Sequence, residues 1–201
     1  IHRVNRRYLP GIALPASVLP DADLRLVVGG HRELLVCVPS HAFRATLAAV
    51  RRDLKPGTRL AWATKGFEHS TGRLPHEVAA EELGTGVPVA VLSGPTFARE
   101  VAAGLPTAMT VAASDPAYAV ALAARLSDRT FRAYTSEDMI GVEVGGAVKN
   151  VLAIGAGISD GLGFGANTRI ALITRGLVEM TRLGVALGAR ASTFMGLSGM
   201  G

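Results

Sequence analysis

Two lysines stand where a side chain could carry out proton chemistry. The first, Lys149, lies in a mainly apolar stretch, residues 141–160, and Gly145 and Gly146 precede it by four and three residues. At helical spacing these glycines leave the helix face beside the ammonium almost without side chains. A lysine in an apolar, close-packed cleft has a desolvated ammonium and can donate a proton near neutral pH. Close helix packing, with Lys149 only reaching solvent along its stem, explains the same pattern.

The second lysine, Lys65, directly follows an apolar run, Thr58 to Thr64, and precedes Gly66. The run predicts a buried strand, and in an open α/β sheet ligands bind beyond the carboxyl ends of the strands. Lys65 can therefore extend into such a crevice while the glycine leaves room for a ligand. A solvated surface lysine is the alternative interpretation.

The segment at 93–98, S-G-P-T-F-A, follows another predicted strand, Val87 to Leu92. Pro95 suits the first turn of a helix, so the N–H groups of residues 96–98 would be free donors. Such donors favour phosphate or carboxamide oxygens. An ordinary capped helix start is the alternative.

These segments require elements that place them together. The apolar residues around Lys149 follow a helical repeat and predict one long, largely buried helix, through Ile140, Val144, Val148, Val151 and Ile154. Before Ser136, strands alternate with helices, which indicates a parallel, doubly wound α/β sheet. After it come two long helical segments without a strand, so we place a domain boundary there. The further expected strands are 34–38, 106–113 and 131–134, and the expected helices are 40–54, 74–83, 115–127, 137–159 and 168–187.

Composition narrows the class of protein. The chain has 201 residues, 49% of them hydrophobic, which is enough for a substantial core. No uncharged apolar run reaches the eighteen or so residues of a membrane span, so we expect none. The single cysteine, Cys37, is expected in the core, and it favours a reducing cytoplasm. The net charge of +5 is spread over scattered arginines, which fits small anions better than nucleic acid.

Five motifs resemble those of bacterial NAD(P)-dependent glycerol-3-phosphate dehydrogenase, in the same order and with compatible spacing. They are V-P-S-H-A-F-R, W-A-T-K-G-F-E, L-S-G-P-T-F-A-R-E-V-A-A-G-L-P-T-A, G-V-E-V-G-G-A-V-K-N and D-G-L-G-F-G-A-N-T-R-I-A-L-I-T-R-G-L-V-E-M. The likeness covers essentially the whole chain. It implies a Rossmann-type NAD(P)-binding domain over residues 1–136 and an all-helical substrate domain over residues 137–201.

The resemblance also implies an activity and roles for residues. The reaction is reversible hydride transfer between NAD(P)H and dihydroxyacetone phosphate, giving sn-glycerol 3-phosphate for glycerophospholipid synthesis. Lys149 would be the proton donor and acceptor. The substrate would contact Lys65, Gly94, Thr96, Lys149 and Asn150; the cofactor would contact Tyr8, in an early helix, with Pro39, Lys65 and Ala98. No metal ligand is expected, and a homodimer is the hypothesis for assembly.

The sequence departs from the family pattern at both ends. The glycine-rich dinucleotide fingerprint is absent before the first predicted strand, and the chain stops where the family continues into an aspartate of the substrate site. We therefore expect an internal, incomplete part of such an enzyme that turns over poorly alone, with the choice between NAD and NADP open. Two alternatives remain: another Rossmann and helical-domain dehydrogenase acting on a hydroxy acid or sugar acid, and a non-catalytic anion-binding or oligomerisation module.

Overall fold

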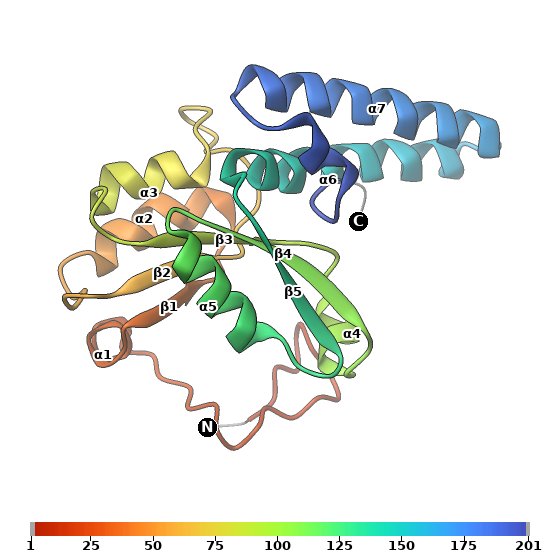
Figure 1. Cartoon of the computed structure of the whole chain (residues 1–201). Helices are drawn as coiled ribbons and strands as arrows, with labels where there is room; N and C mark the ends of the chain where they lie inside the picture. Colours follow the sequence, from red (N-terminus) through yellow and green to blue (C-terminus); the bar gives the residue numbers. More distant parts are fainter. Residues whose placement is uncertain (1–2, 200–201) are drawn as a thin grey trace.

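A computed structural model describes residues 3–199, and a five-stranded sheet forms its centre. The strands lie in chain order, and their pairing is parallel except between the third and fourth. This mixed, mainly parallel sheet confirms the α/β prediction (Figure 1). The strands are β1 (Glu33–Val36), β2 (Arg59–Trp62), β3 (Val89–Ser93), β4 (Thr107–Ala113) and β5 (Phe131–Ser136).

The direction of β4 corrects the expectation of an all-parallel sheet. Its pairing with β3 is antiparallel, with Ser93 opposite Thr110. A parallel pair needs a crossover connection, usually a helix that packs across the sheet. The connection between β3 and β4 holds only α4 (Ala98–Ala102), a five-residue helix that lies beyond the end of the sheet in Figure 1. The chain therefore turns back beside the strand it has just left.

Helices cover both faces of the sheet. On one face, α2 (Ser40–Val50) and α3 (Pro75–Leu83) bury Phe43 and Leu47 against Trp62 of β2. On the other, α5 (Pro116–Leu126) buries Tyr118 against the β3 and β4 side chains. The α5 start was predicted from Asp115, whose carboxylate accepts a hydrogen bond from the N–H of Ala117.

The last part of the chain is the expected helical pair. The helices α6 (Met139–Gly161) and α7 (Ala166–Ala186) lie side by side above the sheet in Figure 1, and the short 3-10 helix η1 (Ala191–Met195) packs against both. Their shared core includes Val144, Met180 and Phe194. The division into domains at residue 136 stays a prediction.

The expected burial of α6 holds for its first half only. Residues from Gly141 to Gly146 are buried, whereas Val151 and Ile154 are 65% and 64% exposed. An apolar repeat indicates which face of a helix is apolar, but not which element packs against it. In the second half of α6, α7 is the described element that packs against the helix, and Val151 and Ile154 stay exposed. By length and composition α6 could also cross a membrane. This is weak support for a span, because core helices of water-soluble proteins pass the same test, and the expectation of no span stays a prediction.

The amino-terminal segment differs most from expectation. Helix α1 (Leu24–Gly30) was not predicted, and the described residues before it form no helix, so Tyr8 lies in a turn. Cys37 is exposed rather than in the core, because successive residues along β1 point to opposite faces and only one face is covered by α2 and α3. Ser40 begins α2 as its first residue and gives no side-chain cap.

Candidate active site

A cavity of about 390 Å³ lies between the carboxyl ends of β2 and β3 and the two long helices. It contains all five residues expected to contact the substrate. No carboxylate is among its described lining residues, so the cavity is positively charged. The lining residues are Lys65, Gly94, Pro95, Thr96, Phe97, Lys149, Asn150, Leu152, Ala153, Ala156, Ile173, Leu177 and Gly199.

Lys65 enters the cavity from the end of β2. Its side chain is half-buried, and Nζ donates a hydrogen bond to the carbonyl oxygen of Gly94 at 3.2 Å. Burial lowers the pKa of the Lys65 ammonium. These contacts exclude the alternative of a solvated surface lysine and tie the ends of β2 and β3 together.

Lys149 enters the same cavity from α6. Burial lowers the pKa of its ammonium, and the positive charge of Lys65 lowers that pKa further. Only three lysines occur in the sequence, at 55, 65 and 149, so two of them converge here. A lysine with a lowered pKa can give up a proton under conditions where an arginine cannot. The cavity thus combines attraction for an anion with a group able to donate a proton.

Gly145 and Gly146 serve close packing, and this packing brings Lys149 to the cavity. A Cβ on Gly146 would lie 2.8 Å from the Ser93 hydroxyl oxygen, and a Cβ on Gly145 would collide with the carbonyl of Ser198. Close packing therefore accounts for the two glycines, and the chemical role of Lys149 stays a prediction. The helix approaches the end of β3 because Gly146 has no side chain, and Lys149 follows one turn later.

The loop after β3 is held equally closely. Gly94 is buried, and a Cβ there would lie 2.8 Å from the carbonyl oxygen of Ala108 on β4. Thr96 lines the cavity beside it. Helix α4 begins at Ala98 and not at Pro95, so the expected donors of Thr96 and Phe97 are loop N–H groups and not a helix N-terminus. The glycine before Pro95 and the proline itself favour this extended loop.

The residues expected to contact only the cofactor do not line this cavity. Pro39 is exposed at the start of α2, beyond the end of β1, and Ala98 is exposed just after the lining residue Phe97. Tyr8 is 69% exposed in the amino-terminal segment, which Figure 1 shows on the side of the sheet away from α6 and α7. Their roles stay predictions.

Sequence reasoning missed the apolar wall of the cavity. It is formed by Leu152 and Ala156 of α6 and by Ile173 and Leu177 of α7. The spacing of four residues within each pair was the available signal, since it places both members on one helix face. A larger and more open groove of about 710 Å³ lies near β5 and η1. It holds none of the expected residues and no lysine, so we assign the site to the smaller cavity.

Sequence comparisons agree with these motifs. The family profile described as NAD-dependent glycerol-3-phosphate dehydrogenase N-terminus matches residues 1–119, and its C-terminus counterpart matches residues 138–201. The chain is 55% identical over 202 residues to glycerol-3-phosphate dehydrogenase [NAD(P)+] of Photobacterium profundum, covering 100% of this chain and 60% of that protein. Identity to the Aeromonas hydrophila enzyme of the same name is 58% over 200 residues, covering 99% and 60%.

Solved structures give the same result. A crystal structure of glycerol-3-phosphate dehydrogenase from Coxiella burnetii matches with a TM-score of 0.95 and 47% identity, over 100% of this chain and 61% of that one. The Plasmodium falciparum glycerol-3-phosphate dehydrogenase matches with a TM-score of 0.90 and 25% identity, over 98% and 56%. The chain thus spans about 60% of the length of such relatives. It belongs to the family of NAD-dependent glycerol-3-phosphate dehydrogenases.

Proposed function

We propose that the full-length protein carrying this chain is an NAD(P)-dependent glycerol-3-phosphate dehydrogenase that reduces dihydroxyacetone phosphate reversibly to sn-glycerol 3-phosphate. Family membership supports the reaction. The observation that carries the proposal is the convergence of Lys65 and Lys149 in one cavity that has no described carboxylate in its lining. Such a cavity favours a small phosphorylated substrate. The lowered pKa of Lys149 also suits this residue to donate a proton as a general acid.

Lys149 has the role of proton donor in this proposal. As a hydride reaches the carbonyl carbon, negative charge grows on the carbonyl oxygen, and the nearby ammonium stabilises it before giving up its proton. Burial and the neighbouring charge of Lys65 lower the pKa of Lys149 and so favour this transfer. In the reverse direction the neutral amine takes the proton from the substrate hydroxyl.

The remaining cavity residues hold the substrate. The Lys65 ammonium supplies a second positive charge, while the Asn150 amide and the Thr96 hydroxyl can hydrogen-bond to substrate oxygens. Gly94 allows the loop to pass close to β4 and accepts the Lys65 hydrogen bond that orients this side chain. The apolar wall from α6 and α7 contributes to the burial of the cavity, and burial of the two ammonium groups strengthens their electrostatic contacts with a substrate.

The described residues fit the nicotinamide end of NAD(P), which supplies the hydride when bound. Lys65 and the loop from Gly94 to Phe97 lie at the carboxyl edge of the sheet, where an open α/β fold binds its ligand. Beyond β1, Pro39 directly precedes α2 and gives no side-chain cap, which leaves N–H groups of the first turn for an anionic oxygen. Tyr8 and Ala98 complete the proposed cofactor contacts. We propose a cytoplasmic location and a homodimer on family grounds alone.

Turnover of the full-length protein tests the proposal. We expect oxidation of NADH or NADPH with dihydroxyacetone phosphate, and the two rates would give the cofactor preference. Hydroxy acids and sugar acids are the matched alternative substrates, and their turnover in place of the phosphorylated ketone would favour the other dehydrogenase class. Absence of turnover with every substrate would refute the enzyme assignment and leave the non-catalytic module.

A further inference from the structure

A buried ion pair joins α6 to α3 away from the cavity. Glu143 is only 4% exposed, although it carries a carboxylate. Its Oε1 accepts a hydrogen bond from the backbone N–H of His76 at 3.0 Å, and its Oε2 lies 2.6 Å from the His76 imidazole Nδ1. One carboxylate therefore contacts both the backbone and the side chain of His76, which ties α6 to the first turn of α3 at this point.

The location of this carboxylate explains how it tolerates burial. His76 is in the first turn of α3, where backbone N–H groups lack partners within the helix. The carboxylate satisfies one of these donors and lies at the positive end of the helix dipole. A buried carboxylate without such partners would be strongly unfavourable, so the contact holds the two helices in one arrangement.

The pair lies on the same stripe of α6 as the proposed proton donor. Glu143, Gly146 and Lys149 follow one another at intervals of three residues, a row that runs along one side of a helix. At about 1.5 Å per residue, Lys149 is roughly 9 Å further along the axis than Glu143. The ion pair fixes one end of this row, and the contact of Gly146 with Ser93 fixes its middle.

The partner of Glu143 is also linked to the second lysine. The chain runs from Lys65 directly into α3 through residues 66–74, and Arg44 of α2 holds this connection by a two-point contact with Glu68. The segment from Lys65 to His76 is therefore held near its start by Arg44 and at its end by Glu143. The ion pair connects the element that carries Lys149 to the segment that begins with Lys65.

We propose that His76 and Glu143 are a positioning pair, which sets the rotation and axial position of α6 and thereby the place of the Lys149 ammonium relative to Lys65. This inference rests on the proposed function only for its effect on turnover. Because a displacement of about 1 Å at a reacting group can cost on the order of a hundredfold in rate, loss of the pair reduces catalysis from a distance.

The surroundings of the pair raise the pKa of both members. Burial opposes a charge on the imidazole, but the hydrogen bond and charge of Glu143, with a smaller contribution from Glu77, raise the pKa of His76 overall. Burial raises the pKa of Glu143. The raised pKa of His76 and the raised pKa of Glu143 have the same consequence. The pair loses its proton at a higher pH than an exposed histidine does. The contact weakens as the pH rises through the pKa of His76 and the imidazole loses its charge.

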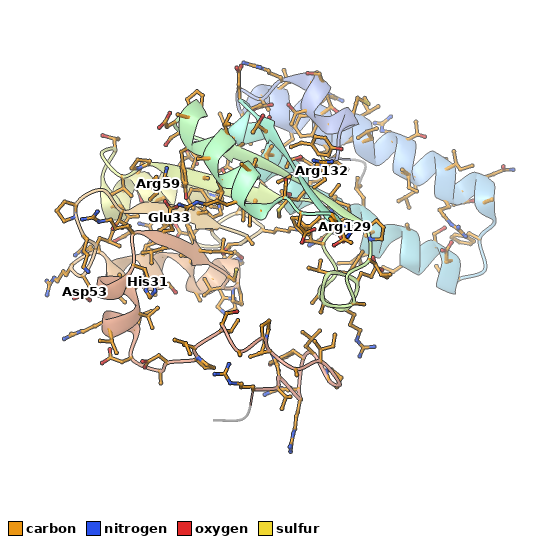
Figure 2. All side chains as sticks on the ribbon, turned by 60° about the horizontal axis from the view of Figure 1, so that its bottom comes forward. His31, Glu33, Asp53, Arg59, Arg129 and Arg132 are labelled. Atoms are coloured by element: carbon orange, nitrogen blue, oxygen red, sulfur yellow. The ribbon has the colours of Figure 1, made fainter. Side chains whose placement is uncertain are left out.

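The test compares substitutions in the full-length protein. His76→Ala removes the imidazole, Glu143→Gln removes the charge but keeps an acceptor, and His76→Asn keeps an N–H donor near the position of Nδ1. Glu33→Gln is the matched control, because Glu33 pairs with Arg59 at the start of β1 and β2 (Figure 2), whereas the cavity lies beyond the other end of the strands. We measure kcat, KM, the melting temperature and the pKa of Lys149 by NMR of ¹³C-methylated lysines, assigned with Lys149→Arg.

We expect kcat of His76→Ala to fall by about tenfold or more and the pKa of Lys149 to move, with His76→Asn restoring both. The control should match wild type. A lower melting temperature with kcat within about twofold and an unmoved Lys149 pKa would overturn the proposal. If His76→Ala does not fold, the same criteria apply to Glu143→Gln. If the wild type does not reduce dihydroxyacetone phosphate, the proposed function fails while the Lys149 pKa still decides the positioning role.

Discussion

Adding one methyl group at Gly146 should separate α6 from the end of β3. The new Cβ would lie 2.8 Å from the Ser93 hydroxyl oxygen, closer than side chains tolerate, and 3.7 Å from Cγ of Lys65. Overpacking a close contact costs about 1–3 kcal/mol. Replacing a helical glycine by alanine also stabilises the helix by roughly 1 kcal/mol, so this gain must be removed from the comparison.

Gly157→Ala supplies that correction. Gly157 lies on the same helix, and a Cβ there would meet nothing within 4 Å. The helix gain is common to both substitutions, so we expect Gly146→Ala to be about 1–3 kcal/mol less stable than Gly157→Ala. Denaturant unfolding of the two full-length variants measures the difference. Because Lys149 is one turn away, kcat should also fall for Gly146→Ala alone. Equal stability and equal kcat would refute the close-packing argument.

Three further predictions concern charges. The hydrogen bond from Arg44 lowers the pKa of Glu68 to about 2. The contribution of Glu68 to stability is therefore present above pH 4.5 and is lost as the pH falls toward 2. In Glu68→Gln, the free energy of unfolding should depend less on pH over this range. Burial is the larger cause of the lowered Lys149 pKa and the charge of Lys65 is the smaller one. Lys65→Met removes the smaller cause, so the basic limb of the pH–rate profile should move to higher pH and KM for the phosphorylated substrate should rise. Asp138 is buried and accepts bonds from the N–H groups of Gly141 and Arg190, so Asp138→Ala should destabilise the protein by about 2–4 kcal/mol in denaturant unfolding.

Much of the sheet was predictable because the residues that end each strand are adjacent to it in the sequence. Apolar runs of strand length are interrupted by proline and glycine, and the ends of β2 and β3 follow from Lys65-Gly66 and Gly94-Pro95. These ends predicted the cavity, since strands of one direction bring their final residues to one edge. The antiparallel entry of β4 was not predictable, because the apolar pattern of a strand is the same in both directions.

Pairings between distant residues were also beyond the sequence pattern. His76 and Glu143 are 67 residues apart, and neither the apolar repeat of α6 nor the start of α3 identifies the other as its partner. The lone carboxylate in G-V-E-V was the only signal. The exposed second half of α6 was missed for a related reason, since periodicity shows which face is apolar but not what covers it.

The proposed proton-donor role of Lys149 is tested most directly by Lys149→Met in the full-length protein, with kcat and substrate binding measured on the same samples. We expect kcat for dihydroxyacetone phosphate to fall by about 10²–10⁴, the usual contribution of general acid catalysis, while the melting temperature stays near that of wild type. Lys149→Arg should not restore it, because arginine keeps its proton. Turnover of Lys149→Met within a few-fold of wild type would contradict the assignment.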